Sequence, residues 1–143
     1  MKHRLLIADH DAEWCELYRR FLTELGYEVE TATDGLDCLA KLRQVAPAVL
    51  VLDQELLWGG GDGVLAWLRE ESPAHKIPVV FLAAAAAGPD RDVFKESPVV
   101  DCLPKPVALT PLLDSVRSAV ASKERREPSN LNRVPCYSEP FIE

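Results

Sequence analysis

The sequence predicts an α/β fold, in which a doubly wound, five-stranded parallel sheet carries helices on both faces. Short apolar runs alternate with amphipathic segments five times along the 143 residues, the pattern of repeated strand-helix units. The runs at 48–53 and 77–83 lack polar alternation, as expected for parallel strands covered on both sides. The chain is about one domain long and can bury a core without disulfides.

The first two units follow from apolar spacing. Residues 4–9 predict a strand and 12–26 a helix that ends at a glycine. The next strand covers 27–32 and the next helix 34–47, which ends at a proline. The apolar faces of these two helices are predicted to consist of Trp14, Leu17, Tyr18, Phe21, Leu22 and Leu25, and of Leu36, Leu39, Ala40 and Leu42.

The remaining three units repeat this pattern. Their strands and helices are predicted at 48–53 and 62–72, at 77–83 and 89–97, and at 99–104 and 107–123. The last helix is expected despite Pro111 within its first turns. We expect 1–121 to form one domain and 122–143 to be a C-terminal tail or linker with no output domain, because prolines there flank isolated apolar residues.

Composition excludes several classes of function. A net charge of −7 disfavours binding to nucleic acid, which needs clustered lysine and arginine. No apolar stretch approaches the ~20 residues of a membrane span, and the first residues lack the apolar core of a secretion signal. We therefore expect a cytoplasmic protein that binds neither nucleic acid nor membrane. The cysteines occur singly along the chain, without a CxxC pair, so we expect them to be reduced structural thiols. They are Cys15, Cys38, Cys102 and Cys136.

Chemistry is expected where the strands end, because ligands of doubly wound sheets bind beyond the carboxyl ends of the strands. Asp9 ends the first strand, Asp53 the third and Ala83 the fourth, and Lys105 follows the fifth. One interpretation is a solvated rim in which Lys105 neutralises Asp53. The other is a phosphoryl site, with an aspartate nucleophile, carboxylates for a hard cation and a lysine for the phosphoryl charge.

These residues resemble the response-regulator receiver domains of bacterial two-component signalling over about residues 3–121. The resemblance rests on four motifs in family order, which are IAD at 7–9, VLD at 51–53, DG at 62–63 and LPKP at 103–106. It implies a flavodoxin-like sheet with strand order 2-1-3-4-5.

The resemblance also implies roles for single residues. Asp53 would be the phosphoacceptor and Lys105 the phosphoryl contact. Asp9, Asp53 and the backbone carbonyl of Glu55 would bind Mg²⁺. The peptide bond before Pro106 would be cis, which X-Pro bonds permit.

The implied function is phosphorelay signalling and not enzymatic catalysis. The chain would accept a phosphoryl group from a sensor histidine kinase or a phosphotransfer protein and signal through a downstream protein partner. A homodimer stays open as a further partner.

Three positions depart from the family pattern. His10 stands where a second acid is usual, with Asp11 one position late, and would itself belong to the metal site. Imidazole is a poor ligand for Mg²⁺ and a better one for softer divalent metals. Ala83 replaces the hydroxyl that contacts the phosphoryl group, and Cys102 replaces an aromatic ring. A hydrogen bond to a charged group contributes about 1.5–3 kcal/mol, whereas full switching needs roughly 5.5 kcal/mol. We therefore expect weak Mg²⁺ binding and weakened switching.

The loop after Asp53 contains three consecutive glycines and a tryptophan, Trp58. The glycines give this loop wide φ freedom. Trp58 is either a partner-binding gate or a side chain packed over the sheet edge, and packing is the interpretation that we favour.

Two other functions are weighed. The departures favour a pseudo-receiver that binds partners without phosphorylation, whereas Asp53 and Lys105 favour a working receiver. Asp9 and Asp11 also fit the start of a haloacid-dehalogenase-like phosphatase, with Asp9 as nucleophile. The later motifs of that family are not evident in the sequence.

Overall fold

The computed structural model describes residues 2–70, 77–83 and 97–126, with side chains described up to residue 122. The strands are β1 (Arg4–Ala8), β2 (Glu28–Ala32), β3 (Val49–Asp53), β4 (Val79–Ala83) and β5 (Val99–Pro104). The helices are α1 (Ala12–Glu24), α2 (Gly35–Val45), α3 (Gly60–Glu70) and α4 (Leu109–Arg126).

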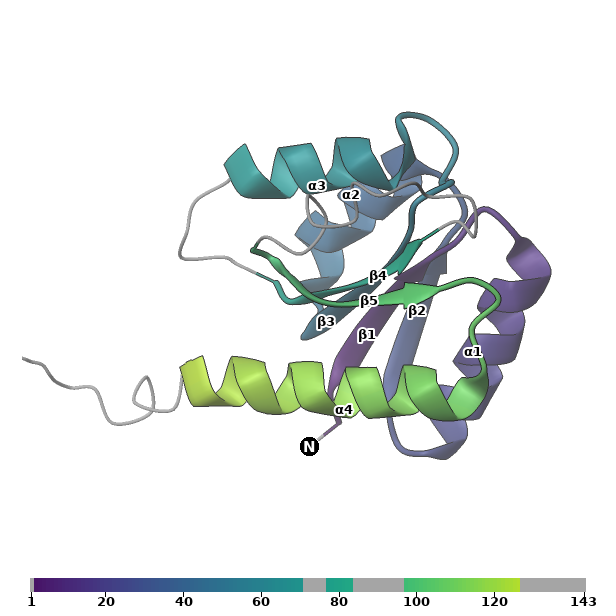
Figure 1. Ribbon diagram of the computed structural model, residues 1–143, viewed down its shortest axis with the longest axis vertical. Coiled ribbons are helices and arrows are strands. Elements are labelled where there is room, and N and C mark those ends of the chain that lie inside the picture. The colour runs from purple at the N-terminus through teal and green to yellow at the C-terminus, as the bar shows by residue number, and fades with distance from the viewer. Residues whose placement is uncertain (1, 71–76, 84–96, 127–143) are drawn as a thin grey trace, which may run out of the picture.

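The five strands form one parallel sheet in the order β2-β1-β3-β4-β5. Helices α2 and α3 lie on one face of the sheet, and α1 and α4 lie on the other (Figure 1). The predicted fold class and strand order are therefore confirmed.

Alternation along the strands divides the core into two layers. Leu50 and Leu52 of β3 point to the side of α2 and α3, whereas Val49 and Val51 point to the side of α1 and α4. All five residues of β3, and all five of β4, are buried. The absence of polar residues before Asp53 therefore reflects burial on both faces of the central strands.

Boundaries of the described elements differ from those predicted by at most three residues, and both ends of β5 agree with the prediction. Helix α1 ends at Glu24, because Leu25 caps it and Gly26 follows with φ +101°. Helix α4 starts at Leu109 and continues to Arg126, past the predicted start of the tail. Pro111 is its third residue, where no intrahelical donor is lost. The helix predicted at 89–97 lies almost wholly outside the described residues.

The predicted helix faces were partly wrong. Leu17, Leu25 and Leu36 are 43%, 45% and 66% exposed. The buried positions include Cys15 and Cys38, which lie in the two core layers. Both are free thiols, in agreement with the expected structural role. Apolar periodicity therefore identified the helices correctly but assigned some exposed leucines to their buried faces.

The loop between β3 and α3 differs from the interpretation that we favoured. Trp58 is 72% exposed and has φ +63°, so its side chain does not pack over the sheet edge. Leu56, which was not singled out, is the buried apolar residue of this loop. Gly59 and Gly60 have positive φ, which L side chains rarely adopt. The glycines therefore form a defined turn that lets α3 begin at Gly60.

Gly61 lies where the start of α3 crosses the end of β3. A Cβ atom there would stand 2.6 Å from the backbone oxygen of Asp53 and 2.9 Å from a ring carbon of Phe81. Gly63, one half-turn later in the same helix, has no atom within 4 Å of its Cβ position. Of these two glycines, only Gly61 is required by packing.

We predict that Gly61→Ala lowers the free energy of unfolding by about 1–3 kcal/mol through overpacking. The matched control Gly63→Ala should be neutral or stabilising by up to about 1 kcal/mol, because alanine favours helix. Urea unfolding of both variants and the parent provides the comparison. Equal stability of the two variants would contradict the packing described here.

Candidate functional site

The carboxyl ends of three strands bring the predicted residues together. Asp9 directly follows β1, Asp53 ends β3 and Lys105 directly follows β5. The amide of Asp9 donates to Ala32 O at 3.0 Å, which continues the ladder beyond the strand. Because parallel strands end at the same edge of a sheet, the three side chains converge on one small site.

Asp53 is completely buried, yet both of its carboxylate oxygens have partners. Oδ1 accepts a hydrogen bond from the amide of Glu55 at 3.0 Å and lies 3.1 Å from Lys105 Nζ. Oδ2 accepts from the amide of His10 at 3.1 Å and lies 2.5 Å from His10 Nδ1. The carboxylate is therefore held from two sides by cationic or cationisable groups.

Asp9 is the second buried carboxylate of the site. Its Oδ1 accepts from the amide of Asp11 at 2.9 Å and lies 3.6 Å from His10 Nδ1. Its Oδ2 has no hydrogen bond within the described part of the chain, although Lys105 Nζ stands 3.4 Å away in an ion pair. Two buried negative charges thus share Lys105 and His10 as counter-charges.

The pKa values follow from this arrangement. Burial raises the pKa of Asp9 above its ordinary value, against the opposing hydrogen bond from the Asp11 amide. Burial also acts to raise the pKa of Asp53, but the hydrogen bonds from His10, Glu55 and Lys105 outweigh it, and the pKa is lowered. Of the two carboxylates, Asp53 is therefore the one whose surroundings favour the ionised form more strongly.

The two basic groups respond in the opposite sense. The hydrogen bond to Asp53 raises the pKa of His10, against partial burial, and so favours the imidazolium. Burial acts to lower the pKa of Lys105, but attraction by Asp9 and Asp53 outweighs it, and the pKa is raised. Both groups are therefore stabilised in the charged form by the carboxylates that they neutralise.

Asp11 does not act as a substitute acid for the site. Its side chain accepts from the amides of Glu13 at 2.9 Å and Trp14 at 3.4 Å, and so caps the N-terminus of α1. The cluster of side-chain donors that could hold a metal ion consists instead of Asp9, His10 and Asp53, whose ligand atoms all lie within 4.8 Å of one another.

The other predicted site residues border this cluster. Ala83 ends β4, next to β3, and is fully buried. Its backbone oxygen accepts a hydrogen bond from the amide of Lys105 at 2.9 Å. The Lys105–Pro106 peptide bond is cis. Glu55 contributes its amide to Asp53, while its side chain is exposed. Trp58 lies in the following loop and is exposed.

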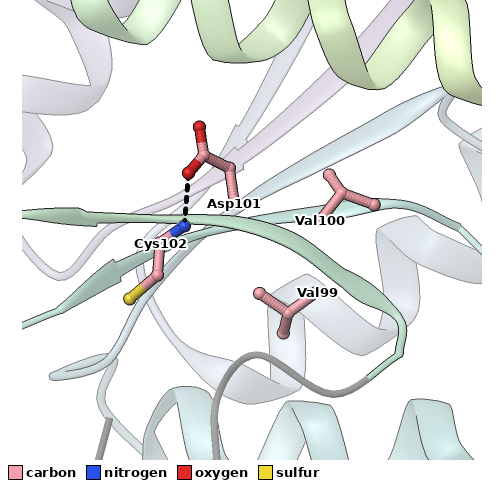
Figure 2. Close-up of a pocket in the computed structure, with 4 residues that line it drawn as sticks. All are labelled: Val99, Val100, Asp101 and Cys102. Carbon is pink, nitrogen blue, oxygen red and sulfur yellow. Dashed lines mark hydrogen bonds between the residues drawn. The ribbon is translucent and has the colours of Figure 1, made fainter. Parts of the chain in front are cut away.

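Cys102 lies away from the charged cluster, on the outer strand β5. A pocket of about 270 Å³ lies along this strand and is lined by Val99, Val100, Asp101 and Cys102. Figure 2 shows Asp101 and Cys102 on opposite sides of β5, with the carboxylate of Asp101 accepting the amide of Cys102 at 2.9 Å. Ser115 Oγ of α4 donates to the same carboxylate. None of the charged site residues lines this pocket.

Sequence reasoning missed one contact, the direct pairing of His10 with Asp53. His10 was considered as a residue of the metal site and not as a partner of Asp53. Its position next to Asp9, at the end of a strand adjacent to β3, was the available signal, but the direction of the ring depends on the loop before α1.

Among the described residues, none of the helices has the length and apolar character that a membrane span requires.

Comparison with known sequences identifies the family. The family model for the response regulator receiver domain matches residues 5–117. The chain is 33% identical over 135 residues to the transcriptional regulatory protein CpxR homolog of Haemophilus influenzae, covering 94% of this chain and 57% of that protein. It is 33% identical over 118 residues to the response regulator MprA of Mycobacterium bovis, covering 82% and 50%. The chain thus spans about half the length of these relatives.

Solved structures agree on the fold. A CheY-like receiver domain protein from Methanospirillum hungatei superposes with a TM-score of 0.78 at 23% identity, covering 88% of this chain and 99% of that one. The receiver domain of a Francisella response regulator gives a TM-score of 0.77 at 23% identity, covering 85% and 98%. With the match of the family model over residues 5–117, the chain belongs to the response regulator receiver domain family.

Proposed function

We propose that this domain accepts a phosphoryl group on Asp53 from a histidine kinase or phosphotransfer protein and signals through protein contacts. The observation that supports this most is the pairing of the buried Asp53 carboxylate with Lys105 at 3.1 Å, at the strand edge where Asp9 also lies.

In the proposed step, a carboxylate oxygen of Asp53 bonds to phosphorus while the phosphorus–nitrogen bond to the donor imidazole breaks. The donor nitrogen leaves with the bonding electron pair and takes a proton from solvent. Lys105, 3.1 Å from Oδ1, is placed to pair with the new phosphoryl charge. A divalent cation held by Asp9 and Asp53 would offset charge on the incoming phosphoryl group.

We further propose that switching is weakened in this chain. Ala83 is fully buried beside β3 and has no hydroxyl to donate to a phosphoryl oxygen. The missing hydrogen bond is worth about 1.5–3 kcal/mol, a third to a half of the roughly 5.5 kcal/mol that full switching needs. Phosphorylation would therefore populate the active shape only in part.

The setting that we propose is the cytoplasm, with a histidine kinase as the donor and a downstream protein as the receiver of the signal. The role of residues 122–143 as a tail or linker stays a prediction. A role of Trp58 as a gate stays a prediction too. The exposure of Trp58 near the site is compatible with contact to a partner.

A pseudo-receiver that binds partners without phosphorylation is the second candidate. One observation favours it. His10 Nδ1 lies 2.5 Å from Asp53 Oδ2, so imidazole occupies the side of the carboxylate that a cation or phosphoryl group would approach. If His10 stays in place, Asp53 remains paired and unreactive.

Incubation with acetyl phosphate and a divalent cation separates these candidates. We expect intact-mass analysis to show one added phosphoryl group, absent in Asp53→Asn, because the surroundings of Asp53 favour the ionised carboxylate and Lys105 stands 3.1 Å from Oδ1. The control Asp62→Asn removes an exposed carboxylate of α3 and should be modified like the parent. A parent protein that gains no phosphoryl group would favour the pseudo-receiver.

Weakened switching is tested by two variants of equal shape. Ala83→Thr supplies a hydroxyl and Ala83→Val does not, so any packing cost is shared. In the presence of beryllofluoride, a mimic of the acyl phosphate, we expect the switching equilibrium of the threonine variant to exceed that of the valine variant by about tenfold or more. Amide chemical shifts of both report the populations. Equal populations of the active shape in the two variants would refute the role assigned to the missing hydroxyl.

A further inference from the structure

The cation site of this domain has an unusual set of donors. Among the described residues, its ligand atoms come from two buried carboxylates and one imidazole, those of Asp9, Asp53 and His10. Receiver domains are expected to use Mg²⁺, which prefers oxygen ligands and retains several waters. Replacing an acid with His10 removes one oxygen ligand and its negative charge. This chain therefore fits Mg²⁺ poorly.

The geometry nevertheless favours a bound cation of another kind. Asp9 Oδ2 is fully buried and accepts no hydrogen bond in the described structure, and its ion pair with Lys105 Nζ is a long one at 3.4 Å, so this oxygen can take a place in the coordination of an ion. His10 Nδ1 faces both carboxylates, at 3.6 Å from Asp9 Oδ1 and 2.5 Å from Asp53 Oδ2. Ligands about 2.0–2.2 Å from one ion are typically about 3–3.5 Å apart, so the His10–Asp53 pair has to open slightly. The ligand atoms of all three residues already lie within 4.8 Å of one another.

We propose that this site selects a late first-row divalent ion, such as Zn²⁺ or Co²⁺, over Mg²⁺. Asp9, Asp53 and the Nδ1 of His10 are its protein ligands. Imidazole nitrogen suits these ions, and their affinity for mixed nitrogen and oxygen sites exceeds that of the harder cations. The inference rests on the proposed function for what the ion does there, because the ion would offset phosphoryl charge at Asp53. Its binding does not depend on phosphorylation.

The inference also gives His10 two alternative contacts. Without the ion, imidazole pairs directly with Asp53. With the ion, the same nitrogen binds the metal, and Asp53 is no longer joined to His10 by a hydrogen bond. The residue that restrains Asp53 at rest would thus become a ligand of the cofactor that prepares the site for phosphoryl transfer.

The test is direct metal binding by the full, chelator-stripped chain. Titration calorimetry with CoCl₂, ZnCl₂ and MgCl₂ gives dissociation constants, and the visible absorption of Co²⁺ reports its ligands. We expect Co²⁺ and Zn²⁺ to bind the parent at least about tenfold more tightly than Mg²⁺. His10→Asp should narrow this preference, because it replaces the imidazole nitrogen with a carboxylate oxygen, which suits Mg²⁺ better. His10→Ala should weaken Co²⁺ binding.

The control variant is His3→Ala, which removes a histidine before β1, at the opposite edge of the sheet, and should bind metals like the parent. Equal or tighter binding of Mg²⁺ than Co²⁺ by the parent would overturn the inference. Unchanged Co²⁺ binding in His10→Ala would also overturn it, since the ion would then lie elsewhere, for example at a thiol.

Failure of this inference is distinct from failure of the proposed function. If Co²⁺ binds as expected but Asp53 gains no phosphoryl group, the metal site stands and the phosphoacceptor role fails. If Asp53 is phosphorylated with Mg²⁺ and His10→Asp changes no metal preference, the phosphoacceptor role stands and the metal inference fails.

Discussion

The charged site depends on the compensation of two buried carboxylates. Asp9 and Asp53 are both fully buried at one edge of the sheet, and an unpaired buried charge would be costly. Lys105 stands 3.4 Å from one carboxylate and 3.1 Å from the other, and His10 approaches both from another side. Two carboxylates and two basic groups thus compensate one another in this site. Replacing any one of them changes the balance of charge.

The fold creates this constraint and also supports it. Parallel strands of similar length place their last residues together, and helices on both faces exclude water from the strands that carry them (Figure 1). The loop after β3 is fixed by backbone contacts, since the amide of Gly35 donates to Leu57 O at 2.7 Å and that of Gly61 donates to Gln54 O at 3.0 Å. Asp53 is therefore presented by a strand and a turn whose positions are determined by packing.

The sequence was sufficient to predict the architecture and the residues at the strand ends, because both depend on local patterns. Apolar runs identify buried strands, and the first polar residue after each run is found at the sheet edge. It was not sufficient for the direction of a side chain in a loop. The pairing of His10 with Asp53 and the exposure of Trp58 depend on backbone turns that apolar periodicity does not encode. The buried helix faces were misplaced for a different reason, because apolar residue type alone did not show that Cys38 would be buried and Leu36 exposed.

The pairing on which this site depends is that of the Asp53 carboxylate with His10, which acts as a counter-ion beside Lys105 when no metal ion is bound. It is tested most directly by nuclear magnetic resonance titration of the His10 ring in metal-free protein, in the parent and in Asp53→Asn. The account predicts a pKa above the ordinary histidine value in the parent and a lower pKa in the variant, since the hydrogen bond to Asp53 is the main cause of the shift. The same His10 pKa in both proteins would contradict it.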